Sequence, residues 1–154
     1  MTGVSKVLMI GVGNEYRGDD GAGLAVARQL RKEAPPEINV VEETGEGTAL
    51  VEAWKGADFV IVVDAIQSGA SPGTIRRFDT EKEKFPTEVF SHSTHAFGIS
   101  GAIELARTLK ELPSHLIVYG IEGQNFAASE KLSPPVEKAV AACAALVLAE
   151  AQRP

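Results

Sequence analysis

The sequence predicts a three-layer α/β fold with a mostly parallel sheet. Short apolar runs alternate along the chain with segments whose apolar residues recur at helical spacing, which is typical of strands joined by helices that cross the sheet. The most apolar run, Phe59–Val63, is typical of a central strand that helices cover on both faces. The 154 residues contain no repeat and no low-complexity linker, so we expect one domain over residues 1–154.

Start and stop signals place the elements along the chain. Asp20 opens the first helix, which ends before the prolines at 35 and 36, and Thr48 is a candidate N-cap of the second. The turn at 69–73 leads into an expected edge strand, and Pro134 and Pro135 suit the first turn of the last helix. In chain order we expect strand 7–12, helix 20–34, strand 38–41, helix 48–54, strand 59–63, strand 74–78, helix 96–109, strand 116–119 and helix 134–151.

Composition and charge exclude several classes of partner. The formal net charge is -6, which gives no electrostatic basis for binding nucleic acid or an anionic membrane. No apolar run reaches the ~18 residues that span a bilayer, and the N-terminus lacks the pattern of a signal peptide. The single cysteine, Cys143, fits the core of the last helix. We therefore expect a cytoplasmic protein that binds a protein or a small ligand.

Three residues are candidates for the functional site. Asp20 follows the first expected strand, Asp64 follows the most apolar one, and His95 precedes a helix. Ligands of open α/β sheets bind beyond the carboxyl ends of the strands, and two carboxylates with an imidazole suit a divalent metal. Spacing alone also allows a helix N-cap at Asp20, a turn residue after the strand at Asp64 and a hydrogen-bonding helix start at His95.

The glycine-rich first loop does not match the common nucleotide-binding motifs. A dinucleotide fingerprint needs glycine where Tyr16 stands, and a phosphate loop needs a lysine and a hydroxyl residue where Asp19 and Asp20 stand. His92 and His95 lack the spacing of a helical zinc-protease motif, and no serine has the flanking glycines of a hydrolase nucleophile.

Six segments in order resemble the hydrogenase maturation endopeptidases. They are GVGNEYRGDDGAG at 11–23, VVDAI at 62–66, SPGTIRRF at 71–78, STHAFGI at 93–99, YGIEG at 119–123 and LSPPVEKAV at 132–140. The resemblance covers nearly the whole chain, and it implies a twisted five-stranded sheet between helices. It places the acidic ligand of the family's first loop on Asp20, the strand-end aspartate on Asp64 and the histidine on His95.

The resemblance also implies a function. Members of the family remove the C-terminal extension from the large-subunit precursor of nickel-iron hydrogenases after nickel insertion. Asp20, Asp64 and His95 would then be both the catalytic and the metal-contacting residues of an aspartyl-type or nickel-dependent peptidase. The nickel would come with the substrate, and another divalent metal is the alternative in the purified protein.

One segment departs from the family pattern. Many members carry an Asp-Gly-Gly-Thr segment that is implicated in substrate recognition, whereas this chain has EETGEGT at 42–48. The role of the missing aspartate is either taken by Glu43 or Glu46 or absent from this chain. Two other functions stay open from the sequence. One is a binding or chaperone-like module that recognises a metalloprotein precursor without cutting it, and the other is a metal-dependent peptidase with broad specificity.

Overall fold

The computed structural model of the protein describes residues 7–90 and 98–152. The strands are β1 Val7–Val12, β2 Ile38–Glu43, β3 Phe59–Ile66, β4 Ile75–Asp79 and β5 His115–Glu122. The α-helices are α1 Ala22–Glu33, α2 Gly47–Trp54, α3 Gly98–Thr108 and α4 Pro134–Ala151, and two short 3₁₀ helices are η1 Gly18–Gly21 and η2 Thr87–Phe90.

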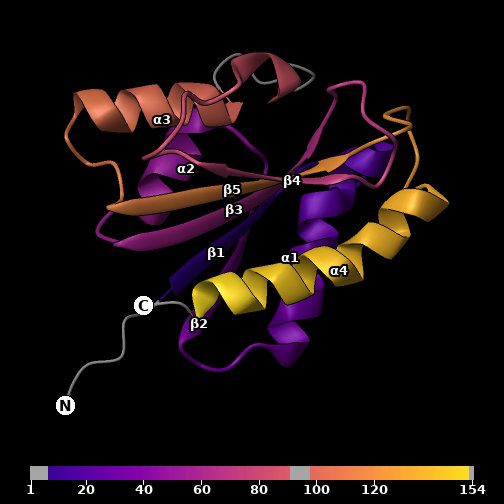
Figure 1. Cartoon of the computed structure of the whole chain (residues 1–154), viewed down its shortest axis with the longest axis horizontal. Helices are drawn as coiled ribbons and strands as arrows, with labels where there is room; N and C mark the ends of the chain where they lie inside the picture. Colours follow the sequence, from indigo (N-terminus) through magenta and orange to yellow (C-terminus); the bar gives the residue numbers. More distant parts are fainter. Residues whose placement is uncertain (1–6, 91–97, 153–154) are drawn as a thin grey trace.

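The strands form one twisted sheet in the order β2-β1-β3-β5-β4 (Figure 1). The first four strands of this order are parallel, and β4 pairs antiparallel with β5 at the edge of the sheet. Helices α1 and α4 pack together on one face, and α2 and α3 pack together on the other (Figure 1). The predicted three-layer, mostly parallel α/β fold and the edge strand are therefore confirmed.

The side chains of β3 alternate between two hydrophobic cores. Ile61 and Val63 pack on the α1/α4 side, whereas Val60 and Val62 pack on the α2/α3 side. This strand is buried on both faces, as its apolar run predicts. Cys143 is fully buried in the α1/α4 core, where burial raises the pKa of its thiol to about 12. It is the core residue expected from the sequence.

Two element boundaries differ from the sequence predictions in ways that affect the site. Strand β3 continues to Ile66, so Asp64 lies inside the strand and not after it, opposite Gly120 of β5. Thr48 is not the N-cap of α2, because Glu46 occupies that position and its carboxylate accepts from the backbone N–H groups of Thr48 and Ala49. The longer Glu46 side chain reaches two free N–H groups of the first turn.

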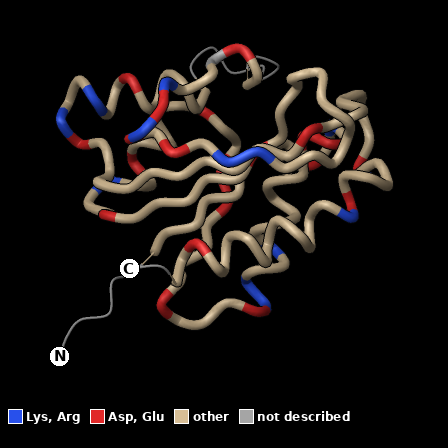
Figure 2. The backbone as a smooth tube through the Cα atoms, in the orientation of Figure 1, with Lys and Arg blue, Asp and Glu red and all other residues tan. Residues whose placement is uncertain are grey.

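Charged residues lie mainly at the ends of the sheet and on the helices (Figure 2). Two arginines, Arg76 and Arg77, lie within the edge strand β4. Arg77 donates two hydrogen bonds to Glu150 of α4, at 2.7 and 3.0 Å, and the hydroxyl of Tyr119 donates a third at 2.7 Å. Because Glu150 is buried, these donors are what allow a carboxylate in the core. They fasten the end of α4 to the edge of the sheet.

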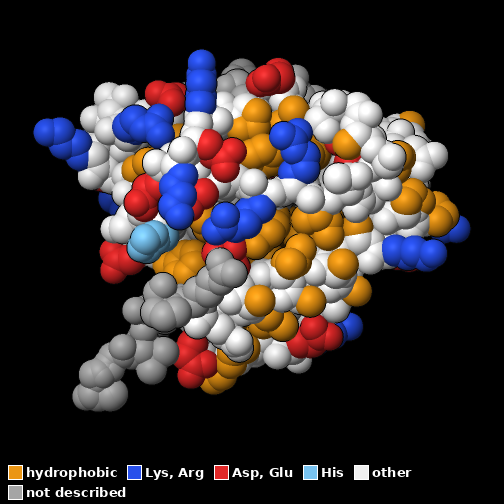
Figure 3. Space-filling view, in the orientation of Figure 1, with side chains coloured by type: hydrophobic (Ala, Val, Ile, Leu, Met, Phe, Trp, Pro, Cys, Tyr) orange, Lys and Arg blue, Asp and Glu red, His pale blue; other side chains and the backbone are white. Residues whose placement is uncertain are grey.

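The outward face of α4 is apolar over residues 141–149. Leu146 is 44% exposed, and four alanines of the helix are exposed beside it, so hydrophobic side chains follow α4 across the surface (Figure 3). The four are Ala141, Ala142, Ala145 and Ala149. No helix within residues 7–90 and 98–152 is both long and apolar enough to cross a membrane.

Candidate active site

Asp20 lies in η1, between the end of β1 and the start of α1. Its Oδ2 accepts a hydrogen bond from the backbone N–H of Asn14 at 3.0 Å, and only 8% of the residue is exposed. The interpretation of Asp20 as a helix cap is wrong, because Gly21 is the residue before α1 and no side chain caps that helix. The first loop therefore turns the Asp20 carboxylate inward at the carboxyl edge of the sheet.

The side chain of Asp64 projects from β3 on the α2/α3 side of the sheet. Side chains alternate between the two faces along a strand, and Val62 and Ile66, two residues before and after Asp64, both pack on that side. The residue is 6% exposed, and the backbone N–H of Ala65 donates to its Oδ1 at 2.7 Å. Burial raises the pKa of this carboxyl well above its usual value, and repulsion by the Asp20 carboxylate raises it further.

The structure brings Asp20 and Asp64 together in one narrow pocket. Beside these two carboxylates, the pocket is lined by Val12, Gly13, Thr44, Gly45, Phe90, Gly98 and Ile99. His95 lies outside the described residues, in the segment 91–97, and the residues that flank this segment, Phe90 and Gly98, both line the pocket. Two of the three predicted site residues are thus neighbours, and the position of His95 stays a prediction.

The donor chemistry of the pair fits a divalent cation. Two carboxylates that repel each other at a buried site are stabilised when a cation lies between them, and carboxylate oxygens are accepted ligands of first-row divalent metals. Within residues 7–90 and 98–152, no group of three or more His, Cys, Asp or Glu side chains is arranged to hold a metal. Asp20 and Asp64 supply two oxygen donors, so a complete site needs further ligands from elsewhere.

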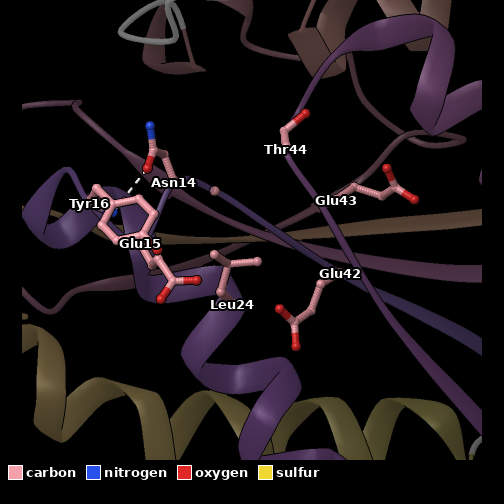
Figure 4. A pocket seen from close by; sticks show the side chains of 8 residues that line it. Asn14, Glu15, Tyr16, Leu24, Glu42, Glu43 and Thr44 are labelled. Atoms are coloured by element: carbon pink, nitrogen blue, oxygen red, sulfur yellow. Dashed lines mark hydrogen bonds between the residues drawn. The ribbon is translucent and has the colours of Figure 1, made fainter. Parts of the chain in front are cut away.

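A wider groove of about 480 Å³ adjoins the narrow pocket and shares Gly13 and Thr44 with it (Figure 4). Tyr16, which is 62% exposed, stands on one side of this groove, and Glu43 stands on the other (Figure 4). Burial raises the pKa of Glu43. The groove is open to the surface and meets the pocket of the two aspartates at Gly13 and Thr44.

The other two glutamates of the groove are paired with arginines. Arg28 donates to Glu15 at 2.8 Å and to Glu42 at 3.0 Å, and Arg31 donates to Glu42 at 2.7 Å. These ion pairs tie α1 to β2 and to the first loop. They are exposed, so each contributes little to stability on its own.

Comparison with known proteins identifies the family. A sequence model described as hydrogenase maturation protease (HycI) matches residues 24–150, most of the chain. This chain belongs to the hydrogenase maturation protease family. Membership makes it a peptide-bond hydrolase, an endopeptidase of hydrogenase maturation, and it confirms the resemblance found in the sequence motifs.

Individual relatives agree with this assignment. A Methanocaldococcus jannaschii protein named as a hydrogenase maturation protease is 30% identical over 156 residues, which cover 96% of this chain and 97% of that protein. The hydrogenase expression/formation protein HupD of Thiocapsa roseopersicina is 28% identical over 146 residues, covering 88% of this chain and 66% of HupD. This chain thus spans slightly less than two thirds of the length of HupD.

A solved structure shows the same fold. The hydrogenase-maturating endopeptidase HybD from E. coli matches with a TM-score of 0.79 at 23% identity, over 94% of this chain and 91% of that chain. The five-stranded sheet between helices that the resemblance implied is therefore confirmed for this family member.

The two glutamates that were candidates to replace the missing family aspartate lie in different surroundings. Glu46 caps α2, with its carboxylate on the N–H groups of Thr48 and Ala49, whereas Glu43 lines the groove that adjoins the pocket of Asp20 and Asp64. A role for either glutamate in substrate recognition stays a prediction. Sequence reasoning did not single out Asp19, whose side chain is fully buried next to Asp20.

The raised pKa of Asp64 predicts a pH dependence of stability. The folded protein holds the Asp64 proton more tightly than the unfolded chain, whose carboxyl has a pKa near 3.8. As the pH rises above that value the unfolded chain ionises first, so the free energy of unfolding falls.

The Asp64→Asn variant has no such proton to lose. We expect its Tm, relative to that of the wild type, to rise with pH from about 4 upward, as measured by thermal unfolding of both proteins over a pH series. A difference in Tm that is constant over the series would contradict the shift.

Proposed function

We propose that this protease removes the C-terminal extension of a nickel-iron hydrogenase large-subunit precursor after nickel insertion, in the cytoplasm. The observation that carries the proposal is the pair of buried carboxylates, Asp20 and Asp64, in one pocket at the carboxyl edge of the sheet. The adjoining groove supports it, because it could hold an extended peptide segment next to the pocket of the two aspartates, which it meets at Gly13 and Thr44.

Each site residue has a role in this proposal. The carboxylates of Asp20 and Asp64, with the imidazole of His95, contact the nickel of the bound precursor, so that only a nickel-loaded precursor is held for cleavage. Three protein ligands leave other coordination positions for groups of the substrate or for water. Nickel bound there supplies a Lewis acid near the scissile peptide bond.

The two aspartates also have the properties of an acid–base pair. In the free protein, the raised pKa keeps a proton on Asp64 at a higher pH than usual, and this proton would leave when both carboxylates contact the nickel. One carboxylate would then accept a proton from the attacking water and donate the same proton to the nitrogen of the leaving amine as the peptide bond breaks. Hydrolysis needs no other co-reactant than water.

The test is intact-mass analysis of a matched large-subunit precursor after incubation with this protein. The precursor is supplied in two forms, nickel-loaded and nickel-free. Loss of a C-terminal peptide from the loaded form alone supports the proposal. Equal loss from both forms contradicts the nickel requirement, and binding of the precursor without any loss of mass favours the binding-module alternative.

In a second assay, this protein is incubated with short unrelated peptides and added zinc or nickel, and hydrolysis of the peptides is measured. The proposal expects these peptides to stay intact, since the nickel and the recognition both come with the folded precursor. Their hydrolysis would favour the peptidase of broad specificity.

A further inference from the structure

Asp19, next to the proposed nickel-contacting Asp20, is a buried carboxylate that the proposed chemistry does not use. It is fully buried, and four hydrogen bonds surround its two oxygens. The backbone N–H of Ser133 donates to Oδ1 at 2.7 Å. Oδ2 accepts from the N–H groups of Gln124 and Asn125 at 2.7 and 2.9 Å, and from the Ser133 hydroxyl at 2.8 Å.

These hydrogen bonds join two segments that are more than 100 residues apart in the sequence. Backbone bonds reinforce the junction, because the N–H of Asp19 donates to the carbonyl of Asn125 and the N–H of Gly18 donates to that of Ser129, both at 2.8 Å. The segment 123–133 between β5 and α4 is thereby fixed against η1. Although burial alone would raise the pKa of Asp19, the hydrogen bonds from Ser133, Asn125 and Gln124 hold it below its usual value.

The backbones of η1 and of segment 123–133 approach each other closely at two glycines. A Cβ atom on Gly123 would lie 3.1 Å from the Cβ of Asp19, and one on Gly18 would lie 2.5 Å from the carbonyl oxygen of Asn125. Asp19 and Asp20 are consecutive residues of the same 3₁₀ turn, the first held by segment 123–133 and the second lining the pocket with Asp64. Whatever fixes the backbone at Asp19 therefore fixes the point from which the Asp20 carboxylate projects.

We propose that Asp19 is a positioning residue, which clamps segment 123–133 to η1 and so sets the Asp20 carboxylate against Asp64. This inference rests on the proposed function. A displacement of about 1 Å at a reacting group costs up to ~100-fold in rate, and loss of a residue that orients a metal ligand costs about 10- to 100-fold in metal affinity. Loss of the clamp affects catalysis and metal binding more than it affects recognition of the precursor in the groove.

The experiment compares three variants with the wild type. Asp19→Asn keeps the shape of the side chain but replaces one acceptor oxygen by a donor that faces N–H groups. Ser133→Ala removes only the hydroxyl donor and is the milder change. Glu150→Gln is the matched control, because Glu150 is also a buried carboxylate with several donors, contacting Tyr119 from the opposite, α1/α4 side of the sheet.

Two quantities decide the outcome, each with Tm measured alongside. In cleavage of the nickel-loaded precursor, we expect Asp19→Asn to lower kcat about 10- to 100-fold with KM nearly unchanged, and Ser133→Ala to lower it less. In titration of the protein alone with Ni²⁺ by calorimetry, we expect Asp19→Asn to raise Kd about tenfold or more. Glu150→Gln is expected to lower Tm and leave both kcat and the Ni²⁺ affinity at wild-type values.

The inference is overturned if folded Asp19→Asn cuts with wild-type kcat, or if Glu150→Gln loses as much kcat at a similar fall in Tm. If Asp19→Asn does not fold at the assay temperature, Ser133→Ala decides, and wild-type kcat and Kd in that variant refute the clamp. Failure of the wild type to cut the loaded precursor would refute the proposed function, and the Ni²⁺ titration would still test the clamp on its own.

Discussion

Replacement of Asp64 by asparagine is expected to reduce cleavage of a nickel-loaded precursor by more than about 100-fold, since loss of residues that merely orient metal ligands already costs 10- to 100-fold. Asparagine has nearly the same shape, but it carries no charge and cannot share a proton with Asp20. The fold is expected to survive, because the substitution removes a buried carboxylate whose charge is disfavoured by burial and by Asp20. Near neutral pH the variant is expected to unfold at a Tm equal to or above that of the wild type.

The measurement is the initial rate of release of the C-terminal peptide, with Tm determined on the same samples. Asp58→Asn is the matched control, because Asp58 is exposed and lies just before the other end of β3, and its rate is expected to equal that of the wild type. Full activity of Asp64→Asn would refute the proposed site. His95→Ala tests the third residue in the same assay, and wild-type activity there would remove His95 from the proposed set.

The sequence predicted that Asp20 and Asp64 would lie close together, but it placed the end of β3 wrongly. Asp20 and Asp64 were expected at one edge because parallel strands present their carboxyl ends together, and the structure confirms that they share a pocket. The end of β3 was predicted too early. A polar residue after five apolar ones reads as the end of a strand, whereas backbone pairing with β5 continues through Ile66 and Glu122 whatever the side chain at 64.

Contacts between distant segments explain why the role of Asp19 could not be predicted from the sequence. The four donors to Asp19 come from residues 124–133, and no local pattern distinguishes Asp19 from Asp20 in the pair of adjacent aspartates. The cap of α2 was missed for a local reason, since Thr and Asp are commoner N-caps than the Glu46 that fills this position. Position in the fold, more than residue type, separates the carboxylates that hold the structure together from those that line the pocket.

Substitution of Gly23 by alanine is expected to be strongly destabilising. A Cβ atom there would lie 2.2 Å from the carbonyl oxygen of Val63 and 2.4 Å from that of Val12. Both neighbours are backbone atoms of central strands and cannot move aside, so we expect a loss of about 3–5 kcal/mol in the free energy of unfolding. Helix propensity would by itself favour alanine by about 1 kcal/mol, so a loss of this size can only come from the close packing of α1 on β1 and β3.

The same close approach links the stability of the fold to the site. Because Gly23 lets the first turn of α1 lie against β1 and β3, it also brings Asp20, three residues earlier, close to the part of β3 that contains Asp64. Urea unfolding of Gly23→Ala and Gly56→Ala separates packing from backbone strain. Gly56 has open space around its Cβ position and a φ of +79°, so alanine there should cost only about 1–2 kcal/mol. A loss at Gly23 no larger than that at Gly56 would contradict the close packing of α1 on the sheet as the reason for the glycine at 23. The placement of Asp20 beside Asp64 would then depend on other contacts.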